Sequence, residues 1–302
     1  MKEIIHGQGH GIAGRFAGLE DPYGRENFAK IILLQVPFDK TTTYQKGSNL
    51  GPEALVEASR HLELYDIETD SQVYLEGIFT APPVEAEESQ DMLNSTYTRT
   101  KKYLEHGKFV VTVGGEHAIS FAPIRAHADH FQKISVLQLD AHADLQPTYE
   151  DDPWSHACIM ARVRELPNVT NCVAVGIRSM AIEEKASIQE ANTFYAHLLE
   201  KNDDWMDDVL AKLTDPVYIT FDLDAFDSSL MPSTGTPEPG GLQWNQTLRL
   251  LKRVAQEKKI IGFDVVELCP APKNKAPDYL AAKLIYKLLS YIFTYSTQRG
   301  LK

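Results

Sequence analysis

Short runs of consecutive apolar residues recur along this chain, with segments of helical periodicity between them. Such runs are typical of strands that are buried on both faces of a sheet. The lengths between them suit crossover helices, so the pattern predicts a parallel sheet with helices on both sides. The expected strands are Lys30–Val36, Val73–Phe79, Phe109–Val113, Ile134–Leu139, Asn171–Gly176, Val217–Leu223 and Ile260–Val266, with a less pronounced eighth at Thr193–Ala196.

Segments of helical periodicity fill the stretches between these strands. The last one has a proline in its first turn, and its apolar residues from Leu280 to Ile292 recur on one face, as in a helix packed on a core. The chain has no internal repeat and no long linker, so we expect one α/β domain over residues 1–302. The expected helices are Pro52–His61, Gln90–His106, Ser120–Phe131, His156–Glu165, Asp203–Leu213, Asn245–Glu257 and Pro277–Phe293.

Composition narrows the class of protein. Of the 302 residues, 43% are hydrophobic and 24% are charged, which is ordinary for a soluble globular protein. The 30 basic and 42 acidic residues give a formal net charge of −12, and no Lys/Arg cluster could displace counterions from nucleic-acid phosphates. We therefore expect no nucleic-acid partner, and the charge mildly favours a cationic ligand.

The cysteines and the N-terminus predict a cytoplasmic location. Cys158, Cys172 and Cys269 are few, odd in number and not at zinc-site spacing, which fits a reducing compartment. The segment Met1–His10 lacks the apolar core of a secretory signal. No apolar run approaches the ~20 residues that span a bilayer, so we expect no membrane partner.

Acids and histidines lie at or directly after the ends of three of the expected strands. Residues two apart in an extended chain point the same way, so pairs at this spacing can converge on one point. The carboxyl ends of parallel strands meet at one edge of the sheet, where ligands bind in open α/β sheets. The three strand ends deliver His117, then Asp140, His142 and Asp144, then Asp222 and Asp224.

Four carboxylates in one place repel each other unless cations neutralise them. One divalent ion would leave ligands over, whereas two ions that share bridging carboxylates use all six residues. Oxygen ligands mixed with imidazole suit manganese, while an all-oxygen set would suit magnesium and thiolates would suit zinc. The residues therefore predict a centre for two divalent ions, and manganese is the expected metal.

Six segments along the chain resemble the ureohydrolase family, which includes arginases and agmatinases. They are Gly114-Gly115-Glu116-His117, Asp140-Ala141-His142-Ala143-Asp144, Ser155-His156-Ala157, Phe221-Asp222-Leu223-Asp224-Ala225-Phe226-Asp227, the loop Gly235–Leu242 and Asp264-Val265-Val266-Glu267. The similarity extends from about Gly47 to the C-terminus, and residues 1–25 match less clearly. The resemblance implies a three-layer α/β/α fold around an eight-stranded parallel sheet, two manganese ions per subunit, and a homotrimer or homohexamer.

The resemblance also implies a role for each site residue. One ion would take His117, Asp140, Asp144 and Asp222, and the other Asp140, His142, Asp222 and Asp224, so that Asp140 and Asp222 bridge. His156 matches the family's loop histidine, which shuttles protons. Glu267 matches the acid that grips the guanidinium group of the substrate.

Hydrolysis of a guanidinium compound is the chemistry that this set implies. A guanidinium is a resonance-stabilised cation and a poor electrophile, but two metal ions ~3.5–4 Å apart lower the pKa of a water molecule towards neutrality. Glu267 can hold the cation by a charge-assisted contact. His156, with an ordinary pKa of ~6.5, can relay a proton to the departing amine, and Asp144 can take the first proton.

The loop between the metal motif and His156 suggests the substrate. Its acids Glu150, Asp151 and Asp152 are a poor surface for the carboxylate of arginine and suit the ammonium of decarboxylated arginine. We therefore expect agmatine, hydrolysed to putrescine and urea in polyamine biosynthesis. Gln146 departs from similar agmatinases, which often carry Arg there, and an acidic loop that faces solvent is the open alternative for the three acids.

Other functions also fit the sequence. Within the family, the substrate could be guanidinobutyrate, guanidine or arginine. A metal-dependent amide deacetylase of the same fold would keep one zinc ion and lack the second set of ligands, whereas both His117 and Asp144 are present. A non-catalytic homologue is the third alternative, against which the intact ligands and Glu267 argue.

Overall fold

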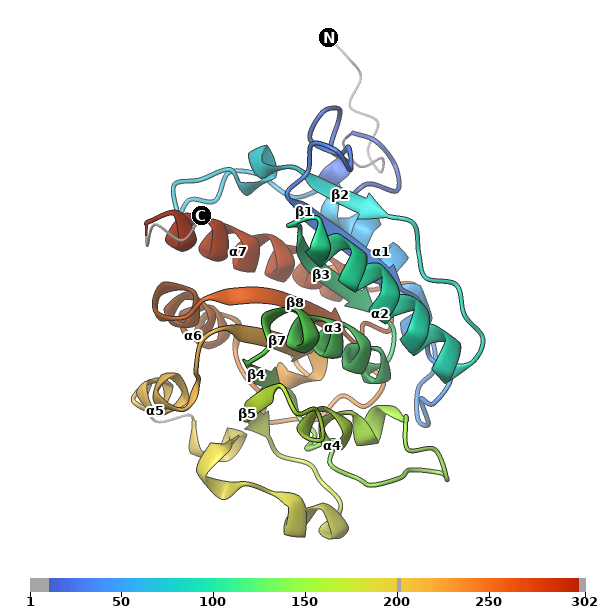
Figure 1. Cartoon of the computed structure of the whole chain (residues 1–302), viewed down its shortest axis with the longest axis vertical. Helices are drawn as coiled ribbons and strands as arrows, with labels where there is room; N and C mark the ends of the chain where they lie inside the picture. The colour runs from blue at the N-terminus through green and yellow to red at the C-terminus, as the bar shows by residue number, and fades with distance from the viewer. Residues whose placement is uncertain (1–10, 200–201, 299–302) are drawn as a thin grey trace.

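The computed structural model describes residues 11–199 and 202–298, so the segment Met1–His10 lies outside the described residues (Figure 1). The eight strands of this part of the chain form one parallel sheet in the order β2-β1-β3-β8-β7-β4-β5-β6. The strands are β1 Ile31–Val36, β2 Ile78–Ala81, β3 Phe109–Gly114, β4 Ile134–Leu139, β5 Val169–Ile177, β6 Thr193–Tyr195, β7 Val217–Asp222 and β8 Ile260–Val266.

Helices cover both faces of this sheet (Figure 1). They are α1 Gly51–Ser59, α2 Ser89–Glu105, α3 Phe121–Phe131, α4 Ile159–Arg164, α5 Trp205–Lys212, α6 Trp244–Glu257 and α7 Ala276–Gln298. Helices α1, α5, α6 and α7 pack on one face, and α2, α3 and α4 pack on the other. The expected three-layer α/β/α fold is confirmed. None of the helices in the described ranges is long and apolar enough to cross a membrane.

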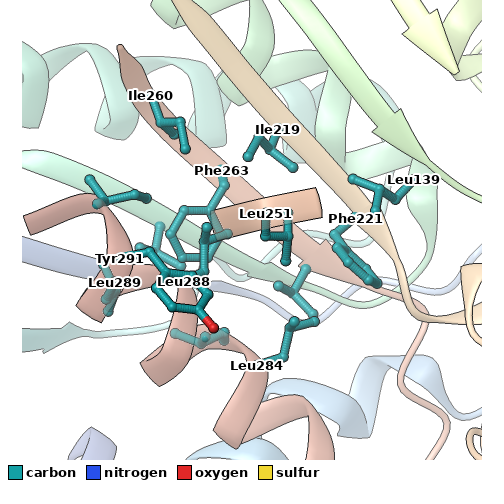
Figure 2. Close-up of a cluster of buried hydrophobic side chains, with 14 of the residues drawn as sticks. Leu139, Ile219, Phe221, Leu251, Ile260, Phe263, Leu284, Leu288, Leu289 and Tyr291 are labelled. Carbon is teal, nitrogen blue, oxygen red and sulfur yellow. The ribbon is translucent and has the colours of Figure 1, made fainter. Parts of the chain in front are cut away.

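Each face of the sheet has its own hydrophobic core. Successive strand residues alternate between them, so that Leu33 belongs to the core under α7 and Ile32 to the core under α3. Figure 2 shows the first core, where Phe221 and Phe263 from the strands meet Leu284 from α7. Burying each such side chain contributes roughly 1.5–3 kcal/mol. Burial on both faces is the reason that these strands are continuous apolar runs.

The expected strand at Val73–Phe79 is wrong in its first half. Residues Val73–Glu76 form a 3-10 turn, and β2 begins only at Ile78. Between them Gly77 has a φ of 75°, and a Cβ there would lie 2.7 Å from Cα of Ala29. The apolar pattern missed this break because Val73 is buried in the turn, as it would be in a strand.

Two other boundaries change near the carboxyl edge of the sheet. Strand β7 ends at Asp222, and the next three residues, Leu223–Ala225, form a 3-10 turn. Helix α4 begins at Ile159, after a separate 3-10 turn over His156–Cys158. Asp224 and His156 are therefore both positioned by 3-10 turns, whereas the pattern predicts His156 at the start of a helix.

Candidate metal centre

Four neighbouring strands end at one place on the carboxyl edge of the sheet. In the order β3-β8-β7-β4 they are followed by His117, Glu267, Asp224 and Asp140. A cavity of about 200 Å³ opens there. Its lining includes His117, His142, Asp144, Gln146, Tyr149, His156, Glu184, Asp222, Asp224 and Glu267, together with Thr42, Thr43 and Tyr44 from the segment after β1.

His117 is the centre of the first group of ligand atoms. Its Nδ1 lies 2.9 Å from Oδ2 of Asp144 and 3.2 Å from Oδ2 of Asp140. Oδ2 of Asp222 lies 3.5 Å from the same nitrogen. His117, Asp140 and Asp144 offer atoms that are all within 4.8 Å of one another, and they could hold a metal ion.

A second group shares Asp140 with the first. Asp140, His142 and Asp224 also offer atoms within 4.8 Å of one another. His142 Nδ1 lies 2.9 Å from Oδ2 of Asp224 and 3.8 Å from Oδ1 of Asp140. The structure thus brings together the six residues that the sequence selects, although Asp222 and Asp224 do so through a turn in which Asp222 accepts a hydrogen bond from the backbone N–H of Asp224 at 2.9 Å.

The electrostatics of this cluster favour bound cations. Burial and the charges of Asp224 and Asp140 raise the pKa of Asp222 well above its usual range. Burial and Asp140 raise the pKa of Asp144 to about 7. A divalent cation among the carboxylates would offset both causes, because it supplies positive charge and replaces the lost hydration. Two imidazoles and four carboxylates therefore fit a pair of divalent ions.

A hydroxyl and a carboxylate hold His117 from behind. Its Nε2 lies 2.9 Å from Oγ1 of Thr220, and the Thr220 hydroxyl donates to Oδ1 of Asp264 at 2.8 Å. Because that hydrogen is used, Thr220 Oγ1 accepts the Nε2–H of the ring, and Nδ1 is the nitrogen left for a metal. We refer to these three residues as the Asp264–Thr220–His117 chain.

Asp144 is fixed by its backbone. It has a φ of 52°, and its carbonyl accepts the N–H groups of Met160 and Ala161 at 3.0 and 3.1 Å. The next residue, Leu145, donates its N–H to Glu184 at 2.7 Å. The start of α4 and the loop after β5 therefore determine where this carboxylate points.

Arg178 fixes the backbone around Asp224. Directly after β5, its guanidinium donates to the backbone carbonyls of Asp224, Phe226 and Glu238 at 2.7, 3.2 and 2.9 Å. Asp227 accepts the N–H groups of Gly240 and Gly241. These contacts join the Asp224 turn to the loop Gly235–Leu242.

Glu267 lies in the cavity but outside both ligand groups. Its Oε1 accepts the backbone N–H of His117 at 2.7 Å, and its own backbone is in the left-handed region with a φ of 68°. Burial and the neighbouring charge of Glu116 raise its pKa well above the usual range. A cationic substrate group next to Glu267 would restore its charge, which fits a residue that binds a guanidinium.

His156 reaches the cavity from the turn before α4. Its Nδ1 lies 3.1 Å from Oγ1 of Thr41, whose hydroxyl donates to Glu116 at 2.8 Å. Burial and the positive charges of His117 and His142 lower the pKa of His156 to about 4. The ordinary value of ~6.5 that the sequence suggests is therefore not retained, and the ring is neutral at pH 7.

The acids Glu150, Asp151 and Asp152 do not line the cavity. Glu150 and Asp151 are exposed and have φ values of 48° and 62° in a tight turn that Tyr149 and Asp152 close with two backbone hydrogen bonds. Asp152 also accepts the N–H of Trp154 at 2.8 Å. The part of this loop that faces the cavity consists of Gln146 and Tyr149.

Several residues of the site lie outside the selection made from the sequence. Glu116 and Asp264 stand beside selected residues in the matching segments, so their positions carry a signal. Thr41, Thr220 and Arg178 have no such signal, because their partners come from other strands and loops. Only the folded chain shows that these three hold the site residues in place.

Known proteins share both the sequence and the fold. The family model described as "Arginase family" matches residues 29–290. The chain is 38% identical over 274 residues to the N(1)-aminopropylagmatine ureohydrolase of Synechocystis sp., which covers 87% of this chain and 89% of that protein. It is 33% identical over 271 residues to the agmatinase of Bacillus anthracis, covering 86% and 91% of the two chains.

Among solved structures, the agmatine ureohydrolase of Thermoplasma volcanium matches with a TM-score of 0.82 at 28% identity. The match covers 90% of this chain and 92% of that one. The similarity of sequence and of fold therefore extends over nearly the whole chain.

Proposed function

Since this chain belongs to the arginase family, and is a ureohydrolase that acts on guanidino compounds, we propose that its substrate is agmatine, which it hydrolyses to urea and putrescine. One cavity contains Glu267 and His156 together with the cluster of acids and histidines, and this observation supports the proposed hydrolysis.

We propose that two manganese ions occupy this cluster. His117, Asp140, Asp144 and Asp222 would hold one, and Asp140, His142, Asp222 and Asp224 the other. The shared Asp140 and the mixed imidazole and carboxylate donors support this assignment. Such a pair of ions, when bound, lowers the pKa of a water molecule from ~15.7 towards neutrality.

Glu267 would bind and orient the guanidinium. Its Oε1 is anchored by the backbone N–H of His117, so the carboxylate has a fixed direction relative to a ligand residue. A paired, charge-assisted contact can then hold the substrate carbon in line for attack. This is positioning, which converts an encounter in solution into a reaction between groups already in place.

Asp144 and His156 would move the protons. Asp144 has a carboxylate in the cavity next to His117, where it can take a proton from the attacking water. As the carbon–nitrogen bond breaks, its electron pair passes to the departing amine, which needs a proton. His156 would relay that proton from solvent and return to its neutral state.

N1-Aminopropylagmatine is a second candidate substrate. The relative from Synechocystis sp. is named for this compound. N1-Aminopropylagmatine has one more ammonium group than agmatine. Glu150, Asp151 and Asp152 directly follow Tyr149, which lines the cavity. Acids outside the cavity suit the far end of a longer cation better than the end of agmatine.

Urea release tests the proposal. The manganese-loaded chain is assayed with agmatine, N1-aminopropylagmatine, arginine and guanidinobutyrate, and again without metal. We expect kcat/KM for agmatine and N1-aminopropylagmatine to exceed that for arginine and guanidinobutyrate by ~10-fold or more. This ratio needs ~1.4 kcal/mol of differential binding. Faster turnover of arginine would refute the substrate choice. Release of acetate from an acetylated polyamine, without urea from any guanidine, would identify a deacetylase instead.

A further inference from the structure

We propose that Glu116 and Thr41 are positioning residues that fix the tautomer of His156, with the hydrogen on Nδ1 and the lone pair of Nε2 left for proton exchange. The consequence for catalysis rests on the proposed role of His156, whereas the tautomer is a property of the folded chain itself. Neither Glu116 nor Thr41 is among the residues that line the cavity.

Glu116 is fully buried and accepts four hydrogen bonds. Its Oε2 accepts the backbone N–H groups of Thr41 and Thr42 at 2.7 and 2.9 Å and the Thr42 hydroxyl at 3.1 Å. Its Oε1 accepts the Thr41 hydroxyl at 2.8 Å. A carboxylate has no hydrogen to give, so both threonine hydroxyls must donate to it.

The Thr41 hydroxyl therefore has only its lone pairs left. One accepts the backbone N–H of His156 at 3.1 Å. The other faces Nδ1 of the same residue at 3.1 Å. An Nδ1 without hydrogen would place two lone pairs against each other, so Nδ1 carries the hydrogen and donates it.

Ser155 is the competing neighbour. Its Oγ lies 3.3 Å from Nδ1 of His156, and a serine hydroxyl could donate to that nitrogen and favour the opposite tautomer. The contact with Thr41 is shorter, and its direction is fixed because Glu116 takes the Thr41 hydrogen. Thr41 therefore decides the tautomer, and Ser155 adapts by accepting.

The proton route follows from this assignment. Nε2 of His156 accepts a proton from solvent to give the imidazolium. It then passes that proton to the amine nitrogen as this nitrogen receives the electron pair of the breaking carbon–nitrogen bond. The neutral ring is regenerated with its hydrogen still on Nδ1. The opposite tautomer would have Nε2 already protonated and could not accept.

Nitrogen NMR of the full chain with ¹⁵N-labelled histidine reads the tautomer directly. We record it without manganese, at pH 8.5. The wild type should show His156 with hydrogen on Nδ1, and Thr41→Ser should keep it. Thr41→Val should release the ring into a mixture of both tautomers.

Glu116→Gln gives the sharpest outcome. The two backbone N–H donors at Oε2 require the amide oxygen there, which turns the amide NH₂ towards Thr41. Thr41 then accepts from Gln and gives its own hydrogen to Nδ1 of His156. We therefore expect this variant to invert the tautomer.

Two variants serve as controls for a loosened loop. Thr42→Val removes the corresponding hydroxyl bond to Glu116 without a contact to His156, and Ser155→Ala removes the competing hydroxyl. Both should keep the hydrogen on Nδ1. A wild type with the hydrogen on Nε2, or an unchanged signal in both Thr41→Val and Glu116→Gln, would overturn the proposal.

Kinetics of the manganese-loaded chain test the consequence. Thr41→Val should lower kcat by roughly 10- to 100-fold, with KM changed by less than about twofold and activity restored in Thr41→Ser. An unchanged kcat in a variant whose tautomer has changed would refute the positioning role. If the wild type releases urea from no guanidine, the proposed function fails, while the NMR result still decides the tautomer.

Discussion

His117 and His156 are each held by the same two kinds of group, a threonine hydroxyl and a buried carboxylate. Asp264, Thr220 and His117 form one chain, and Glu116, Thr41 and His156 form the other. In both, a threonine hydroxyl donates to a buried carboxylate and accepts from the imidazole. The first chain uses Nε2 of its ring and the second uses Nδ1.

Their surroundings differ. Thr220 and Asp264 are fully buried residues of the adjacent strands β7 and β8. Thr41 and His156 belong to a loop and to a turn, and Thr41 is only half-buried. Asp140 and Asp144 raise the pKa of His117 well above its usual range, against the effect of burial. Burial and nearby positive charge lower that of His156 to about 4.

One hydrogen-bond pattern is therefore used in two different surroundings. In the sheet it holds Nδ1 of His117 towards the carboxylates, as the proposed role of a metal ligand requires. In the loops it holds the ring of His156 at the cavity, as the proposed role in proton transfer requires. The first should therefore affect metal binding, and the second should affect turnover.

The largest effect is expected from Asp140→Ala, because Asp140 belongs to both ligand groups. Bound manganese should fall to one ion or none per chain, and urea release should fall by at least about 1,000-fold. Elemental analysis of the purified variant measures this. Active wild-type protein with a single ion per chain would contradict the assignment of two ions.

Glu267→Gln comes next, since Glu267 contacts the backbone of His117 and is affected by the charge of Glu116. Losing a charge-assisted contact with the guanidinium of the substrate should lower kcat/KM by roughly 10- to 100-fold, with both manganese ions retained. Steady-state kinetics and metal analysis are done on the same sample. Parallel loss of metal would instead show that Glu267, like His117, takes part in metal binding.

Thr220→Val distinguishes most directly between the Asp264–Thr220–His117 chain and the hydrogen bonds from Glu116 through Thr41 to His156. His117 loses the partner that fixes its tautomer, so manganese affinity should fall by about 10- to 100-fold. Excess manganese should restore activity, whereas Thr41→Val should bind manganese like the wild type and stay slow. Calorimetric titration of both variants with manganese provides the measurement. Equal manganese affinities of Thr220→Val and the wild type would show that the Asp264–Thr220–His117 chain does not affect metal binding.

The smallest effect concerns the acids outside the cavity. Changing Glu150, Asp151 and Asp152 together to their amides should lower kcat/KM for N1-aminopropylagmatine about fivefold, because exposed charge pairs contribute ~0.2–1 kcal/mol each. Agmatine should be affected less. The matched control neutralises Asp204, Asp207 and Asp208 at the start of α5. Equal losses with both substrates would mean that the three acids contact neither cation.

Much of the fold could be predicted from the apolar pattern, because strands buried on both faces are largely apolar. The pattern failed at Val73–Phe79, where a buried turn and a strand look alike in sequence. The six candidate ligand residues could also be selected, since acids and histidines at the ends of three separate strands meet at one edge of the sheet. The substrate remains a prediction, and the structure places Glu150 to Asp152 outside the cavity.

The order of apolar runs along the chain indicates which residues stand at the ends of the strands, and hence the chemistry that they can supply. The packing of the folded chain places β8 between β3 and β7, so that Glu267 emerges between His117 and Asp222. Folding also brings Thr41 to a histidine 115 residues away, and Thr220 to one 103 residues away. A threonine in a loop or strand carries no local signal of its partner, because a hydrogen bond depends on distance in space and not on distance along the chain.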